Sequence, residues 1–163
     1  MVESAPPEQK ERLPRWVMQS VAYGLLALLP FLFLFVHVCH GFNVAARESE
    51  AYADQSIHAI ITTWSEDELI KRASPELKAD TNQGELDSAF ANMRKLGKLQ
   101  SYSGLDDNGK VRLNWTNGHF SYIAYYEAKA TFQNGRLLVT IHIVKRDKQW
   151  QITGFHVDPE PFL

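Results

Sequence analysis

The run from Trp16 to Val36 holds no charged residue, and this feature constrains the fold more than any other. The run reads WVMQSVAYGLLALLPFLFLFV. A helix rises about 1.5 Å per residue, so a run of about 21 residues spans roughly 31 Å, the hydrocarbon thickness of a bilayer. The sequence therefore predicts a transmembrane helix over residues 16–40, in contact with lipid through residues 16–38.

Basic residues on the two sides of this run predict its orientation. Lys10, Arg12 and Arg15 precede it, whereas Arg47 is the one basic residue soon after it. Basic flanks favour the cytoplasmic side of a membrane. We therefore expect residues 1–15 to form a flexible cytoplasmic tail of a single-pass inner-membrane protein, with its C-terminal domain in the periplasm.

Two other interpretations of the run stay open. In a cleaved signal peptide, Val44-Ala45-Ala46 would supply the cleavage site, but such peptides have a shorter apolar core of about 7–15 residues. A lipoprotein anchor on Cys39 would need a small residue before it, and Val38 is not small. The sequence favours the uncleaved single span.

The chain after the anchor has the size and charge of one ordinary domain. Residues 47–163 number about 117, enough for a hydrophobic core. After Arg15 the chain has 14 Lys and Arg against 16 Asp and Glu, so no basic stripe is present and we predict no nucleic-acid partner. Cys39 is the sole cysteine, which excludes an intramolecular disulfide.

The first half of this domain shows helical patterns. Apolar residues from Arg47 to Trp64 recur at helical spacing, with Ile57, Ile60 and Ile61 among them. Ser65 with Glu68 forms an S-x-x-E pattern, which predicts a capping box at the start of a short helix. Ser74-Pro75 favours a new helix start, and a further helix is expected after Gly84, ending at Gly97.

After Gly97 the pattern changes to strands separated by turns. Asn-Gly pairs between apolar runs are typical of hairpins, because both turn positions need positive φ. Strands are predicted near 98–105, 110–116, 119–132, 136–146 and 149–158. In the third strand the even-numbered residues from Phe120 to Phe132 share one face. Helices followed by a meander predict an α+β fold, with one sheet curling over helices.

Five short motifs of core and turn residues occur in this region: WSEDEL (64–69), ASPELK (73–78), KLGKL (95–99), ATFQNG (130–135) and QWQITGFHV (149–157). With them, the chain resembles membrane-anchored members of the nuclear-transport-factor-two-like superfamily, which includes ketosteroid isomerase. The resemblance implies a cone-like domain of three helices packed on a curved antiparallel sheet. It implies no activity, because function varies widely within the fold.

Enzymes of this fold place an acid or a histidine inside the cone. Four residues of this chain are candidates for such an interior position. By alternation, Glu127 and His142 should point away from the core, and His58 lies off the apolar stripe of its helix. His156 shares parity with Trp150 and Ile152, so we expect it to face the interior.

Aromatic side chains could line a cavity for an apolar ligand, although in a small domain they more often form the core. The candidate pocket consists of Trp64, Tyr122, Tyr126, Trp150 and His156. Because no catalytic motif accompanies these residues, the sequence predicts neither an enzyme nor a cofactor.

His37, Cys39 and His40 lie together at the end of the apolar run. Imidazole and thiolate suit copper or zinc, so a metal-handling assembly factor is a weaker alternative. These three residues lie on one short stretch, and no second cluster accompanies them. The sequence therefore favours their being ordinary residues at the membrane boundary, and no metal site is predicted.

The outer face of the predicted sheet is more apolar than a solvated face should be. Its candidate partner-binding residues are Ile123, Tyr125, Leu138, Thr140 and Val144. An apolar face suggests a covering partner, and the resemblance implies dimers through this surface. We predict a non-enzymatic, membrane-anchored accessory, assembly or scaffold subunit that contacts a membrane protein complex or a second copy. The alternative is a small-molecule-binding or hydrolase/isomerase-type domain that uses the cone interior.

Overall fold

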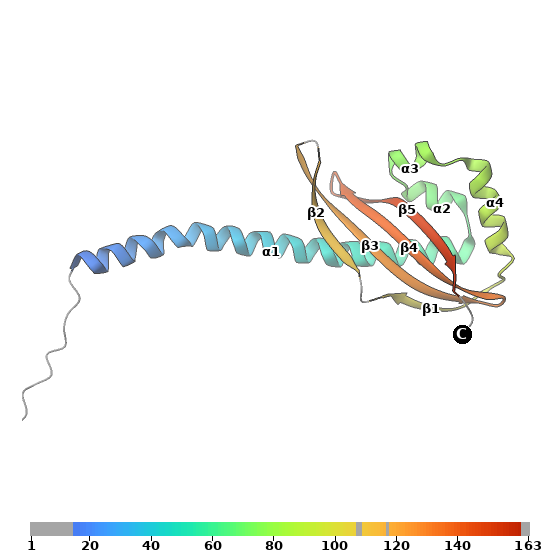
Figure 1. Ribbon diagram of the computed structural model, residues 1–163, viewed down its shortest axis with the longest axis horizontal. Helices are drawn as coiled ribbons and strands as arrows, with labels where there is room; N and C mark the ends of the chain where they lie inside the picture. The colour runs from blue at the N-terminus through green and yellow to red at the C-terminus, as the bar shows by residue number, and fades with distance from the viewer. Residues whose placement is uncertain (1–14, 107–108, 117, 161–163) are drawn as a thin grey trace, which may run out of the picture. The chain divides into compact units, whose positions relative to one another are not determined.

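The structure is a computed structural model that describes residues 15–106, 109–116 and 118–160 (Figure 1). The chain divides between Phe42 and Asn43 into two compact units, each of which is described by itself. We call the part from Asn43 onward the domain. Apart from Arg15, the predicted cytoplasmic tail lies outside the described residues.

Helix α1 spans Arg15–Thr63 and continues through Pro30. The sequence analysis treats residues 16–40 and the helical pattern from Arg47 separately, and the structure joins them in one continuous helix. The connecting residues hold one glycine and no proline, so nothing in them stops a helix. Within α1, one segment near the N-terminus is long and apolar enough to cross a membrane.

Three shorter helices and five strands follow α1. The helices are α2 (Glu66–Arg72), α3 (Pro75–Asp80) and α4 (Gln83–Arg94). The strands are β1 (Leu99–Leu105), β2 (Lys110–Thr116), β3 (His119–Phe132), β4 (Gly135–Arg146) and β5 (Gln149–Pro159). These bounds confirm the predicted α+β class and the predicted strands, each to within about a residue.

The strands form one antiparallel sheet around β3. Strand β4 pairs along one edge of β3, and β5 pairs with β4. On the other edge, β2 pairs with the first half of β3 and β1 pairs with the second half. The outer edge of β5 is partly occupied, because Ala73 forms a parallel bridge with Ile152.

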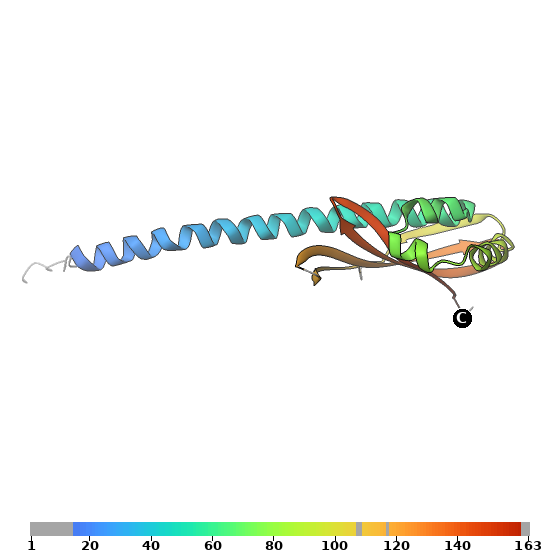
Figure 2. The ribbon, with the colours of Figure 1, turned by 90° about the horizontal axis from the view of Figure 1, so that it is seen from above.

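The core lies between the sheet and the domain part of α1, which runs along one face of the sheet (Figure 2). We call this the inner face. The helix contributes fully buried Ile57, Ile60 and Ile61, and the sheet contributes alternate residues of β3 and β4. The alternation predicted for β3 is confirmed from Ala124 to Phe132, where every even-numbered residue is buried.

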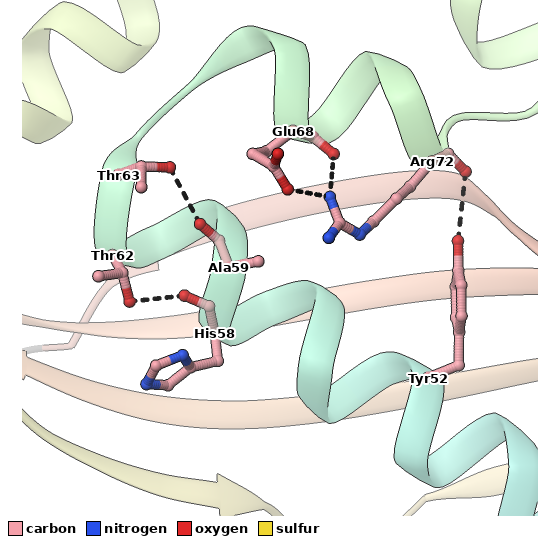
Figure 3. Close-up of polar contacts among 7 residues, drawn as sticks. All are labelled: Tyr52, His58, Ala59, Thr62, Thr63, Glu68 and Arg72. Atoms are coloured by element: carbon pink, nitrogen blue, oxygen red, sulfur yellow. Dashed lines mark hydrogen bonds and ion pairs between the residues drawn. The ribbon is translucent and has the colours of Figure 1, made fainter.

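One polar contact joins α1 to α2, and another lies within the last turns of α1 (Figure 3). The hydroxyl of Thr63 donates to the Ala59 carbonyl at 3.0 Å, and the hydroxyl of Tyr52 donates to the Arg72 carbonyl at 3.5 Å. The capping box predicted at the start of α2 is wrong. Ser65 makes no side-chain cap, and the Glu68 carboxylate instead accepts from Arg72 one turn later.

The later helix starts follow their sequence signals more closely. Ser74 caps α3, with its hydroxyl accepting from the Leu77 amide at 3.2 Å. Helix α4 is expected to follow Gly84, but it begins at Gln83 and includes Gly84, because the Asn82 side chain caps it.

The β3–β4 turn is placed as predicted, but for a different reason. Gln133 and Asn134 form the turn, and Gly135 pairs with Phe132 inside the ladder without positive φ. A Cβ on Gly135 would lie 3.1 Å from Leu96, so close packing explains this glycine. In the β4–β5 turn Asp147 and Lys148 have φ of 49° and 66°, as a type I′ hairpin requires. The predicted turn residues Asp107, Asn108 and Asn117 lie outside the described residues.

Candidate interaction surface

The five predicted partner-binding residues all belong to the face of the sheet opposite α1, which we call the outer face. Strand pairing places Ile123 beside Val144 and aligns Thr140 with Glu127. Ile123 is 37% exposed. Tyr125 and Leu138 are half-buried, and Thr140 and Val144 are buried.

The neighbours of Thr140 and Val144 on the same face account for their burial. Val144 lies between Ile123 and Gln151, and Thr140 lies between Glu127 and His156. On the outer face, Ile123, Tyr125 and Leu138 are therefore at least partly accessible, whereas Thr140 and Val144 are covered by their neighbours.

Two adjoining hollows lie over the outer face. The larger, of about 620 Å³, has Ile123 and Val144 among its apolar residues and charged groups at its margin: Glu76, Lys145, Arg146 and Asp147. The second, of about 490 Å³, is lined by residues that include Tyr125, His142, Lys110 and Arg112. Ile123 and Thr153 line both, so the hollows meet there.

A bulge in β5 places Thr153 at this junction. Ile143 pairs with Ile152 and His142 pairs with Gly154, which leaves Thr153 as the extra residue. A bulge reverses the alternation of the residues that follow it, and sequence periodicity gave no sign of it.

The reversal overturns the prediction that His156 faces the interior. His156 has a 72% exposed side chain, and its Nε2 lies 3.2 Å from a carboxylate oxygen of Asp158. Its neighbours Phe155 and Val157 pack against the core instead.

Tyr125 is held in place on the outer face by two neighbours. Its hydroxyl donates to the Glu127 carboxylate, and its ring meets His142 edge-on with centroids 5.0 Å apart. The hydrogen bond to Glu127, more than burial, raises the pKa of Tyr125. A large aromatic side chain fixed in this way loses little conformational freedom when a partner covers it.

The candidate pocket is not assembled as predicted. Trp64, Tyr126 and Trp150 are buried core residues, and Tyr122 is half-buried. The Trp64 ring lies 5.7 Å from both Phe90 and Phe132, centroid to centroid. Among the described residues the buried polar side chains are Ser49, Ser56, Ser74 and Thr140, so neither an acid nor a histidine is among them.

Sequence reasoning missed a polar link between α1 and β1. The Tyr102 hydroxyl donates to Asp54 at 2.8 Å, and the Tyr102 ring meets His58 edge-on at 5.6 Å. Burial, and then the Asp54 carboxylate, raise the pKa of Tyr102 well above its ordinary value of 10.0. No periodic pattern pairs residues this far apart in the chain, so only tertiary structure reveals the link.

His37, Cys39 and His40 are exposed residues of α1. Over the part of the chain that the structure describes, no group of three histidine, cysteine or acidic side chains could hold a metal ion.

Comparison with protein-family models, curated proteins and solved structures finds no match to this chain.

Proposed function

We propose that the protein is a membrane-anchored accessory, assembly or scaffold subunit that contacts another protein through the outer face of its sheet. The pair of adjoining hollows that meet at Ile123 carries this proposal. The apolar segment of α1 supplies the anchor.

The composition of the outer face supports a protein partner. Protein interfaces combine an apolar centre, enriched in aromatic residues, with a polar rim. Here Ile123 and Val144 supply apolar side chains and Tyr125 an aromatic one, and Lys110, Arg112 and Arg146 lie beside them. A rim charge mainly affects association rate and specificity, so we expect the apolar centre to supply most of the affinity.

The finer parts of the proposal rest on the sequence. The basic residues before the apolar run favour a domain on the periplasmic side of an inner membrane. The succession of short helices and a five-stranded antiparallel sheet is compatible with the nuclear-transport-factor-two-like resemblance. That resemblance favours a second copy of the chain as one partner, and the anchor favours a neighbouring membrane protein as the other.

The test is purification of the full-length protein from its membrane in mild detergent, with the co-purifying proteins quantified by mass spectrometry. We expect one partner in fixed ratio, or a defined homo-oligomer. Ile123→Glu places a charge at the junction of the hollows and should reduce the bound partner at least tenfold.

Ala89→Glu is the matched control, because it introduces the same charge at an exposed position of helix α4 that lines neither hollow. It should leave partner recovery unchanged. Loss of the partner in both variants, or in neither, would contradict a specific role for the outer face.

A further inference from the structure

The β2–β3 hairpin carries a second group of apolar side chains, on the side of its strands opposite to Ile123, and one of them, Phe120, also lines the larger hollow. Leu113, Trp115 and Phe120 are 50%, 57% and 67% exposed. Strand pairing sets Trp115 opposite Phe120, and their rings meet edge-on with centroids 4.2 Å apart. We call these three residues the hairpin patch. Large apolar side chains grouped in this way on a surface mark an interaction site.

The hairpin patch lies at the end of the domain where α1 begins its contacts with the sheet. Strand β3 and the domain part of α1 run in the same direction, because Phe132 packs on Trp64 while the Tyr126 hydroxyl lies 2.7 Å from the Ser49 hydroxyl. Phe120 precedes Tyr126 by about 20 Å of strand, whereas Asn43 precedes Ser49 by only about 9 Å of helix. Figure 1 shows the hairpin at this end of the sheet.

The same end of the domain is tethered to the apolar segment. Val38, the last residue expected to contact lipid, precedes Asn43 by about 8 Å of helix. If the segment spans a bilayer, so short a connection keeps this end of the domain close to the bilayer surface. Tryptophan and phenylalanine are side chains that favour the interfacial region of a membrane.

The two sides of the hairpin differ in polarity, as an interfacial element requires. Leu113, Trp115 and Phe120 occupy one side, whereas exposed Arg112 and His119 occupy the other. A hairpin with this alternation can bury its apolar side among lipid headgroups and keep its polar side in water.

We propose that the hairpin patch inserts into the headgroup region of the bilayer that anchors α1. This inference rests on the anchoring part of the proposed function and is independent of the outer face. A second attachment point would restrict rotation of the domain about α1 and so fix the direction in which the outer face is presented to a partner.

The test measures membrane depth with spin labels on the full-length protein in liposomes. Single cysteines are introduced in a Cys39→Ser background by Phe120→Cys, Arg112→Cys, Asn134→Cys and Phe33→Cys. Each label's relaxation is compared with lipid-soluble oxygen and with a water-soluble nickel complex. The labels at 120 and 33 should respond several-fold more to oxygen, and those at 112 and 134 should respond more to nickel.

Each other pattern contradicts the proposal in a distinguishable way. A label at 33 in lipid with a label at 120 in water overturns membrane insertion of the hairpin and keeps the anchor. A label at 33 in water overturns both proposals. Shielding of the label at 120 from both reagents, with spin–spin broadening, would show that a second copy covers the patch instead of lipid.

Discussion

The two halves of strand β3 share one alternation of side chains but differ in what covers them. In the second half, the even-numbered residues from Ala124 to Phe132 are 5% exposed or less, under α1. In the first half, Phe120 occupies the same side of the same strand and is 67% exposed. Periodicity therefore determines the side on which a residue lies, and the reach of the covering helices determines whether it is buried.

The difference separates residues that stabilise the fold from residues available for function. Side chains beneath α1 contribute to stability through packing. Side chains that continue the same pattern beyond the core are free to contact lipid or protein. Substitutions on the two halves of β3 can test this division between stabilising residues and residues available for contacts.

The strongest test compares two identical substitutions on the same side of β3. Phe132→Ala leaves a cavity against Trp64 and should lower the free energy of unfolding by about 3–5 kcal/mol. Phe120→Ala removes an exposed ring and should change it by less than about 0.5 kcal/mol. Both are measured by denaturant unfolding of the full-length protein in detergent micelles. Equal losses in the two variants would contradict the division.

A smaller effect on the free energy of unfolding is expected at Tyr126, which is the buried aromatic residue nearest to the exposed half of β3. Tyr126→Phe removes the buried hydrogen bond to Ser49 and should cost about 0.5–1.5 kcal/mol. Ser49→Ala removes the other partner. The double variant should cost clearly less than the sum of the two single variants, because the two side chains share one interaction. Additive losses would show that this contact does not join α1 to the sheet.

The smallest effect concerns pH and the Tyr102–Asp54 link. The pKa of Tyr102 is raised in the folded domain, so stability from the protonated hydroxyl is complete below its ordinary value of 10.0. It is lost as the pH rises above that value, where the unfolded chain ionises first. Unfolding measured from pH 8 to pH 11 should show a shallower decline in Tyr102→Phe than in the wild-type protein. Identical slopes would mean that Tyr102 titrates normally in the folded state.

The sequence was sufficient where local chemistry decides the structure. Turn residues and alternation located all five strands, and Pro75 correctly marked the start of α3. The inward side of β3 followed from its parity. These features depend on neighbours in the chain, so they are readable without knowledge of the tertiary fold.

Long-range effects account for the errors. Thr153 bulges because of how β5 meets β4, and this displaced His156 from the interior to the surface. The capping-box error is an exception with a local cause, because Glu68 pairs with Arg72 one turn later in the same helix. On the candidate surface, the side of the sheet was predictable, but the burial of Thr140 and Val144 depends on strand pairing. The hairpin patch was missed because parity assigned Phe120 to the core.

Photo-crosslinking in native membranes from position 123 tests most directly whether the outer face contacts another protein. A photoreactive phenylalanine analogue replaces Ile123 in the full-length protein, and a matched variant carries it at Asn134 in the β3–β4 turn. We expect one discrete adduct from position 123, with a second copy or a defined membrane protein, and none from position 134. Absence of an adduct at position 123, or equal adducts at both positions, would contradict a protein-contact role for the outer face.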